Sequence, residues 1–300
     1  MNKAVLFLVF NRLDTAKKIF EKIKEVKPKR LYIASDGPRK DVDGEQDKVE
    51  NVREYVLKNI DWECDVNTLF RETNLGCGIA ISQAISWFFE HEKDGIILED
   101  DCVPCESFFY FCEELLDKYK NNKNIWQISG NGFFKDSKTT ESYYFSKLPQ
   151  CWGWATWADR WEKYRFDVSN FDCKKFKNFS KSKEVQEYWK EVLKSLQLGK
   201  VDTWDYQWIF VIVENKGYCI DPYNHLVSNI GISGTHINGN SPFLNVNIDE
   251  IDKIIHPKKI KYNTRAVDFI YQSLFGIKDK SLHAKLHRFT SKILRVIKNR

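Results

Sequence analysis

Three consecutive acidic residues, Glu99, Asp100 and Asp101, follow the apolar segment 95–98. A buried carboxylate is costly unless a cation or hydrogen-bond donors compensate its charge. We therefore expect positive charge here. A divalent cation that bridges to a diphosphate is the simplest source, because hard cations prefer carboxylate and phosphate oxygens and offset the charge of a departing diphosphate. The alternative is a solvated turn that caps the next helix.

The elements around these acids alternate between apolar segments and segments with helical spacing. The expected strands are residues 5–10, 31–34, 66–70 and 95–98, and the expected helices are residues 14–26, 48–59, 79–92 and 108–119. This alternation predicts an open, doubly wound α/β sheet, in which ligands bind at the carboxyl ends of the strands. Asp36, Arg71 and Asp101 each come just after such an end.

Residues 96–111, Ile-Ile-Leu-Glu-Asp-Asp-Cys-Val-Pro-Cys-Glu-Ser-Phe-Phe-Tyr-Phe, resemble the metal-binding segment of the N-acetylglucosaminyltransferase I type of GT-A glycosyltransferases and their bacterial relatives. In that family the acidic triplet is followed by a loop, a Phe pair and a helix. The similarity extends over roughly residues 4–240, and the cysteine-rich stretch after the triplet departs from the family pattern. The resemblance implies a GT-A, Rossmann-like nucleotide-diphospho-sugar transferase fold with a mostly parallel central sheet flanked by helices.

The resemblance also assigns roles to the acidic triplet. It implies that Asp101 ligates Mn²⁺, or Mg²⁺, held on the donor diphosphate. Glu99 and Asp100 then face the nucleotide and its ribose.

Residues after the first two strands are expected on the nucleotide side. Asn11 and Arg12 follow the first strand, where related enzymes place an arginine against the nucleotide. Asp36 follows the second strand, where the family has an acid that accepts a hydrogen bond from uracil N3. The alternative for Asp36 is a local turn ahead of Gly37-Pro38.

The segment Arg71-Glu-Thr-Asn-Leu-Gly-Cys-Gly78 leads into a helix. The Arg71 guanidinium, small residues and helix N–H groups could converge there on a phosphate. Bacterial sugar transferases of this type commonly show a similar arrangement, with Asn74 in the Asn-x-Gly position. A purely structural glycine-rich turn is the alternative.

Displacement at an anomeric carbon needs a base for the acceptor proton. Asp205 is the candidate, because Thr203-Trp-Asp-Tyr-Gln-Trp208 resembles the Trp-Asp segment that carries the base in the family. Asp202 is the nearby competitor, and helix capping is the alternative role for Asp205.

Two further candidates come from the family's order of motifs. His236, in Ser233-Gly-Thr-His236, is expected to reach the diphosphate or the metal, although a structural histidine is the alternative. Trp154, in Trp152-Gly-Trp-Ala-Thr-Trp157, is expected to line the donor and acceptor pocket, since tryptophan faces pack on sugar C–H groups. Core packing is the alternative for Trp154.

We expect residues 1–245 to form the catalytic domain, with a nucleotide-sugar-binding half (1–120) and an acceptor half (121–245). The net charge of +5 resides in the tail: residues 256–300 hold 12 Lys/Arg against two Asp, which gives +10 there and 5 − 10 = −5 elsewhere. This distribution does not fit a nucleic-acid-binding body. Residues 246–300 are expected to form a basic helical extension.

The basic tail suggests a membrane contact. Residues 282–300 have helical apolar spacing, so a helix there could lie on the cytoplasmic face of the inner membrane and reach a lipid-linked acceptor. A packing helix or a subunit contact is the alternative. No apolar run reaches the roughly 18 residues of a membrane span, so we expect a cytoplasmic protein with reduced cysteines.

These residues and the resemblance together predict a metal-dependent, inverting glycosyltransferase. It would move a sugar from a nucleotide diphosphate, with UDP preferred, to a glycan or lipid-linked glycan acceptor in bacterial surface glycan biosynthesis. One alternative is a sugar-1-phosphate nucleotidyltransferase, which needs a glycine-rich basic loop after the first strand, whereas residues 10–14 hold no glycine. The other is a non-catalytic sugar-binding module.

Overall fold

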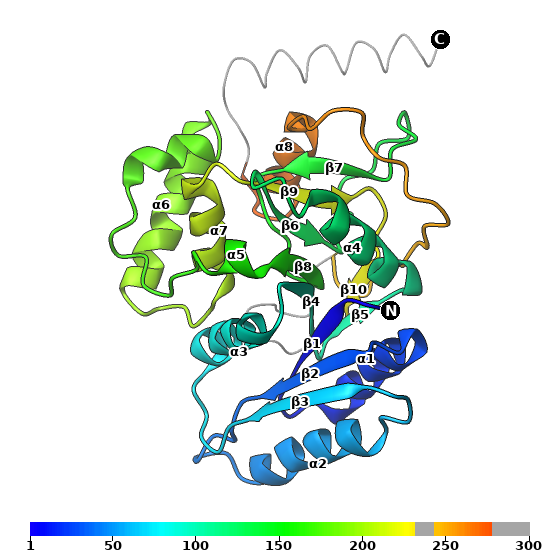
Figure 1. The fold of residues 1–300 in the computed structure, drawn as a ribbon. Helices are drawn as coiled ribbons and strands as arrows, with labels where there is room; N and C mark the ends of the chain where they lie inside the picture. Colours follow the sequence, from blue (N-terminus) through cyan, green and yellow to red (C-terminus); the bar gives the residue numbers. More distant parts are fainter. Residues whose placement is uncertain (232–242, 278–300) are drawn as a thin grey trace.

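The computed structural model describes residues 1–231 and 243–277, and its centre is an eight-stranded sheet in the order β3-β2-β1-β4-β8-β6-β9-β7 (Figure 1). The strands of this sheet are β1 (Ala4–Val9), β2 (Arg30–Ser35), β3 (Asp65–Phe70), β4 (Asp94–Glu99), β6 (Ile125–Ser129), β7 (Tyr143–Ser146), β8 (Trp154–Trp157) and β9 (Tyr218–Pro222). A second, two-stranded sheet pairs β5 (Cys102–Pro104) with β10 (Val227–Asn229).

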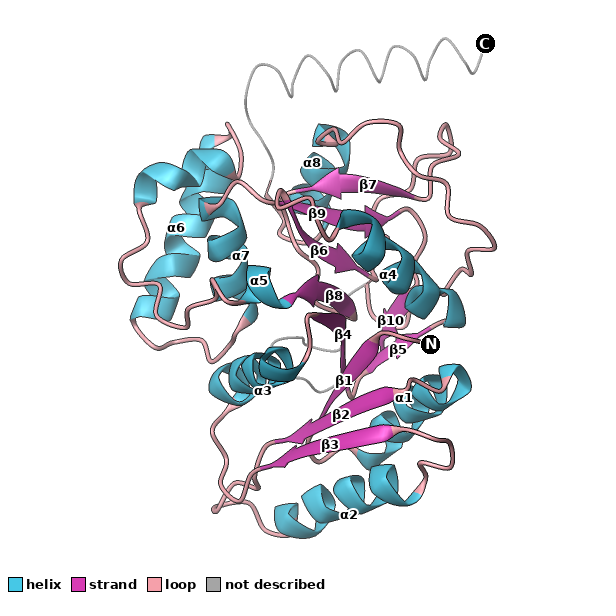
Figure 2. Cartoon of the chain, in the orientation of Figure 1, coloured by secondary structure: helices cyan, strands magenta, loops and turns pink. Residues whose placement is uncertain are grey.

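The helices cover both faces of the large sheet (Figure 2). They are α1 (Leu13–Val26), α2 (Glu45–Lys58), α3 (Cys77–His91), α4 (Glu106–Tyr119), α5 (Ala158–Trp161), α6 (Lys183–Gln197), α7 (Asp205–Glu214) and α8 (Thr264–Ser273), with a 3₁₀ helix at Cys173–Asn178. Every element expected in residues 1–119 is present. The largest shift of an end is three residues, at the start of α2.

The sheet is mostly parallel. β3, β2, β1 and β4 run in one direction; β8 is antiparallel to both β4 and β6, so β6 and its parallel partner β9 share the direction of β4. The edge strand β7 is antiparallel to β9, which leaves two of the eight strands reversed. The predicted α/β architecture, a mostly parallel central sheet flanked by helices, is confirmed.

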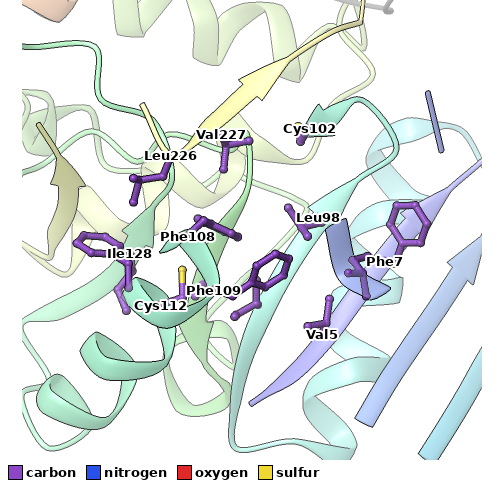
Figure 3. Close-up of a cluster of buried hydrophobic side chains, with 14 of the residues drawn as sticks. Val5, Phe7, Leu98, Cys102, Phe108, Phe109, Cys112, Ile128, Leu226 and Val227 are labelled. Atoms are coloured by element: carbon purple, nitrogen blue, oxygen red, sulfur yellow. The ribbon is translucent and has the colours of Figure 1, made fainter. Parts of the chain in front are cut away.

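β1 is buried along its whole length between two hydrophobic clusters. Val5 and Phe7 face the cluster formed with α1, α2 and α4, whereas Leu6 and Leu8 face the cluster formed with α3, α5 and α7. Successive side chains of a strand point to opposite faces, so a continuous apolar run is required where helices cover both. Figure 3 shows Val5 and Phe7 in the first cluster together with Phe109 of α4.

A third cluster holds the second half of the chain together around α6 and α7. Trp189 of α6 stacks on Phe179 with ring centroids 4.6 Å apart and donates a hydrogen bond of 3.1 Å to the Tyr271 hydroxyl of α8. α8 therefore packs on the segment that carries α6 and α7, whereas residues 248–256 pack on α4. The division into domains stays a prediction, and residues 282–300 lie outside the described part of the chain.

Within residues 1–231 and 243–277, none of the helices combines the length and the apolar character needed to cross a bilayer.

Asp221 on β9 is a fully buried carboxylate within the sheet. The hydroxyls of Ser146 and Ser129 lie nearby, but neither forms a well-aligned hydrogen bond with it. Burial raises the pKa of Asp221 to about 7, against the lowering effect of these hydroxyls. The native state therefore retains a proton that the unfolded chain releases near pH 4.

This difference predicts a pH-dependent stability. Because the folded pKa is the higher one, Asp221 destabilises the native state increasingly as the pH rises from about 4 to about 7. Asp221→Asn removes the titration, so its free energy of unfolding relative to wild type should rise by about 3 kcal/mol between pH 5 and pH 8. Urea unfolding at both pH values measures this, with Asp252→Asn at an exposed aspartate as the control. A constant difference across this range would show that Asp221 does not titrate there.

Candidate active site

A cleft of about 1240 Å³ opens at the carboxyl ends of β1, β2, β3 and β4. Nine of the predicted site residues line it, and they are Asn11, Arg12, Asp36, Arg71, Asn74, Glu99, Asp100, Asp101 and Asp205. The first eight follow or end the four neighbouring parallel strands, while Asp205 begins α7. The open α/β sheet thus brings together residues that are far apart in the sequence.

Two predicted residues are not among them. Trp154 is fully buried, and its ring stacks on Trp204 with centroids 5.3 Å apart and an angle of 18°. The pocket role predicted for Trp154 is wrong, because β8 lies inside the sheet and this residue faces the core between the strands and α7. Its neighbour Trp152 lines the cleft instead. His236 lies outside the described residues.

The acidic triplet is paired with a single guanidinium. Arg12 contacts the Asp100 carboxylate, and its Nη1 lies 3.0 Å from Oδ2 of Asp101. The backbone N–H of Phe10 donates a further hydrogen bond of 3.2 Å to Asp100. Arg12 therefore ties the end of β1 to the end of β4.

The pKa shifts indicate that one guanidinium does not offset the burial and mutual repulsion of these acids. Burial, followed by the charges of Asp101, Asp100 and Asp205, raises the pKa of Glu99 well above its usual range. Burial also raises the pKa of Asp100 to about 6, despite Arg12. For Arg12, burial lowers the pKa, but the two aspartates outweigh it and the net shift is upward. Three carboxylates facing one guanidinium form a site that attracts a further cation.

The residues present fit a divalent ion that binds together with a phosphate-containing ligand. Within the described chain, no group of three His, Cys, Asp or Glu side chains is arranged to hold a metal by itself. Mg²⁺ and ions like it are commonly held by one or two carboxylates together with substrate phosphates and water. Asp101, whose side chain is 13% exposed, and Glu99, which is also partly exposed, are the members of the triplet open to such an ion.

β10 supports Asp101 from the other side. The backbone N–H of Ile230 donates to the Asp101 carbonyl at 2.8 Å, and Nδ2 of Asn229 lies 3.5 Å from its Oδ1. A Cβ at Gly231 would lie only 2.5 Å from Oδ2 of Asp101, so a glycine is needed for this close approach. Sequence analysis did not identify Asn229, because nothing in the local pattern pairs residues 101 and 229.

The start of α3 is capped by two aspartates that are distant in the sequence. Asp36 accepts hydrogen bonds of 3.0 and 3.1 Å from the N–H groups of Leu75 and Gly76, and burial raises the pKa of Asp36 although these bonds lower it. Asp202 accepts bonds of 2.9 Å from the next two N–H groups, those of Cys77 and Gly78.

This capping differs from the predicted phosphate cradle. The helix N–H groups expected to meet a phosphate already donate to the carboxylates of Asp36 and Asp202. Asp36 also accepts from the N–H of Gly37 at 2.9 Å, which is the local turn considered as its alternative. Contact between Asp36 and a nucleobase stays a prediction. Asp202, which was considered only as a competing base, caps the start of α3.

Arg71 and Asn74 flank this capped turn. Nδ2 of Asn74 donates to the Gly37 carbonyl at 2.8 Å, which joins the loops that follow β2 and β3. Arg71 donates to Oε1 of Gln83 at 3.1 Å and has no ion-pair partner among the described residues. Burial lowers the pKa of Arg71, although Asp36 opposes the shift. Arg71 is thus available to an anionic ligand.

A second cationic group, which sequence analysis did not identify, lines the same side of the cleft. Arg39 contacts the carboxylate of Glu45, which also accepts a hydrogen bond of 2.8 Å from Nδ2 of Asn11. The bond from Arg39 lowers the pKa of Glu45 to about 2. Arg39 lies over the ring of Phe10 at 5.8 Å from its centroid. The position of Arg39 after β2 was the available signal.

Asp205 is held at the first turn of α7. Its Oδ1 accepts from the N–H of Tyr206 at 2.8 Å and from the hydroxyl of Thr203. No hydrogen bond within the described chain occupies its Oδ2, and the residue lines the cleft. The capping alternative for Asp205 is therefore present, and one carboxylate oxygen remains able to take up a proton.

No protein-family model matches the chain, and no curated protein matches it. Among solved structures, it is similar to an apo UDP-glucose pyrophosphorylase, with 11% identity, 74% of this chain and 90% of that chain covered, and a TM-score of 0.37. It is also similar to the glycosyltransferase GlyE of Streptococcus pneumoniae TIGR4, with 10% identity, 73% and 45% coverage, and a TM-score of 0.34. For TarS 1–349 of S. aureus the identity is 8%, the coverage 53% and 47%, and the TM-score 0.36. The chain thus spans less than half of the GlyE and TarS chains, and TM-scores this low assign it to no family and no activity.

The capping of α3 by Asp202 predicts a measurable stability. Asp202→Ala removes the acceptor for two helix N–H groups and should lower the free energy of unfolding by about 1–2 kcal/mol, as loss of a helix cap does. Gly78→Ala should act in the same direction, because its Cβ would lie 2.7 Å from Oδ1 of Asp202. Urea unfolding measures both, with Asp43→Ala at an exposed position as the control. Stability equal to wild type in both variants would exclude this cap.

Proposed function

We propose that this protein is a metal-dependent glycosyltransferase that moves a sugar from a nucleotide diphosphate, with UDP preferred, to an acceptor hydroxyl. The observation that carries the proposal is that one cleft holds both groups that such an enzyme needs. The acidic triplet around Asp101 lines this cleft, and so does Asp205, which has a free carboxylate oxygen.

The donor would lie along the ends of the parallel strands. Arg71, Arg39 and Arg12 all line this half of the cleft and supply positive charge for a nucleotide diphosphate. Guanidinium groups suit phosphate oxygens because their N–H donors match them in pairs. Mn²⁺ or Mg²⁺ held by Asp101 would offset the charge that develops on the departing diphosphate.

Asp205 would act as the base. Oδ2 of Asp205 would accept the proton of the acceptor hydroxyl while the acceptor oxygen forms its bond to the anomeric carbon. The bond between the anomeric carbon and the diphosphate breaks in the same step, and its electron pair leaves with the diphosphate. A direct displacement with one base inverts the anomeric configuration, so we propose an inverting enzyme.

The two alternative functions have less support. A sugar-1-phosphate nucleotidyltransferase would need a phosphate-binding loop after the first strand, but β1 ends at Val9 and α1 begins at Leu13, which leaves no glycine and little backbone for such a loop. A sugar-binding module would not need a carboxylate poised like that of Asp205. Bacterial surface glycan biosynthesis, at or near the inner membrane, is the setting we propose for the transferase.

The proposed donor site is tested by calorimetry. A panel of UDP-sugars titrated into wild type should give binding of one sugar nucleotide that requires Mn²⁺. Asp101→Ala should lose this metal-dependent binding, by about tenfold or more, because it removes the carboxylate proposed to ligate the ion. Asp117→Ala, which removes an exposed carboxylate outside the cleft, is the control. Absence of nucleotide binding under every condition would sink the glycosyltransferase proposal.

The proposed base is tested separately. Asp205→Asn keeps the size of the side chain and its acceptor for the Tyr206 N–H but cannot take up a proton. Its kcat should fall by about 10²–10⁴-fold, while the affinity for the donor stays the same. Steady-state kinetics with the donor found above measure this, and the anomeric configuration of the product shows whether transfer inverts. A kcat close to that of wild type would move the role of base to another residue.

A further inference from the structure

The two halves of the chain line the cleft with different charged groups. The basic lining residues, Arg12, Arg39 and Arg71, all come from the first half, which also supplies the acidic triplet and Asp36. The described lining residues from Phe133 onward include only two charged side chains, the carboxylates of Asp202 and Asp205, and Asp202 is already bonded to the start of α3. The part of the cleft lined by the second half of the chain therefore has carboxylates and no cationic side chain among its described residues.

The second half of the chain also supplies an aromatic wall, which consists of Trp152, Tyr188, Tyr206 and Phe275. All four side chains are partly exposed and line the cleft. They come from the loop before β8, from α6, from the first turn of α7 and from the residues that follow α8. The wall is thus assembled only when these elements pack together.

The rings of the aromatic wall are fixed by edge-to-face packing. Tyr188 packs against Phe275 with centroids 5.3 Å apart and an angle of 65°, and Trp152 packs against Phe133 at 5.6 Å and 74°. Tyr206 packs against Trp189 at 6.1 Å and 84°. Rings held in this way present preformed surfaces, so little conformational entropy is lost when a ligand stacks on them.

We propose that the aromatic wall is the acceptor subsite and that it binds an uncharged saccharide. This inference rests on the proposed function and names the class of its acceptor. Tyr206 follows Asp205 directly, so a sugar stacked on the wall has a hydroxyl within reach of the proposed base. The cleft of about 1240 Å³ exceeds the usual 300–1,000 Å³ of a site for one ligand, which leaves room for a second beside the donor.

Charge selects the acceptor class. A phosphate on an acceptor sugar at the wall would face the carboxylate of Asp205, with no cationic side chain among the described residues of this part, and like charges repel strongly in a partly desolvated cleft. An uncharged sugar instead offers hydroxyl groups that can donate to this carboxylate and C–H faces that pack on the rings. In a lipid-diphosphate-linked acceptor, the phosphates would have to remain outside this part of the cleft.

Ligand-observed NMR tests the subsite on the full chain saturated with UDP and Mg²⁺, which is diamagnetic. The probes are methyl glycosides of common hexoses and of their disaccharides, each compared with the 6-phosphate of the same sugar. We expect a neutral glycoside to bind and its phosphorylated counterpart to bind about tenfold more weakly or worse. Equal or tighter binding of the phosphorylated sugars would overturn the proposal.

Variants of the aromatic wall test whether the neutral glycoside binds there. Tyr188→Ala and Trp152→Leu should each weaken binding of the neutral glycoside about tenfold, the loss expected for one stacking surface, whereas Tyr188→Phe should retain it. Affinity for UDP with Mg²⁺, measured in the same samples, reports that each variant is folded and that the proposed donor site is intact. Tyr110→Ala, at an exposed tyrosine outside the cleft, is the control.

The results of these binding experiments distinguish a failure of the acceptor subsite from a failure of the proposed glycosyltransferase function. Wild type that binds UDP but no neutral glycoside, or variants that bind both as wild type does, would contradict the acceptor subsite alone. Wild type that binds no UDP would contradict the proposed function and the subsite with it.

Discussion

The arrangement of the cleft depends on negative charge gathered at the end of β4. Glu99, Asp100 and Asp101 are desolvated by the sheet and helices around them, and Arg12 is the guanidinium that pairs with them directly. Buried charge of one sign persists in a fold only when other groups compensate it. That requirement fixes the end of β1 against the end of β4. It also leaves Asp101 open to a cation that arrives with a phosphate ligand.

A second constraint joins the two halves of the chain. The first N–H groups of a helix need acceptors, and at α3 these acceptors are Asp36 from the loop after β2 and Asp202 from the loop before α7. Gly76 and Gly78 leave space for the Asp202 carboxylate, since a Cβ at either would lie within 2.7 Å of it. The capping that completes α3 therefore also positions the segment that carries Asp205.

The apolar pattern of residues 1–119 was sufficient to predict the parallel half of the sheet, because strands covered on both faces and amphipathic helices leave distinct local signals. The reversed strand β8 and the pairing of β5 with β10 were not predicted, since both join segments that are far apart in the sequence. β8 places Trp154 in the core, and β10 brings Asn229 and Gly231 against Asp101.

The sequence by itself determined which chemical groups follow each strand, and therefore that carboxylates and guanidinium groups meet at one edge of an α/β sheet. Only the tertiary structure decided how those groups are used. Asp36 and Asp202 cap α3, Arg39 pairs with Glu45, and the aromatic wall forms from four separate segments. The physical reason is that burial and periodicity are local properties of the chain, whereas the partner of a polar group depends on which distant donor or acceptor packing brings within hydrogen-bond distance.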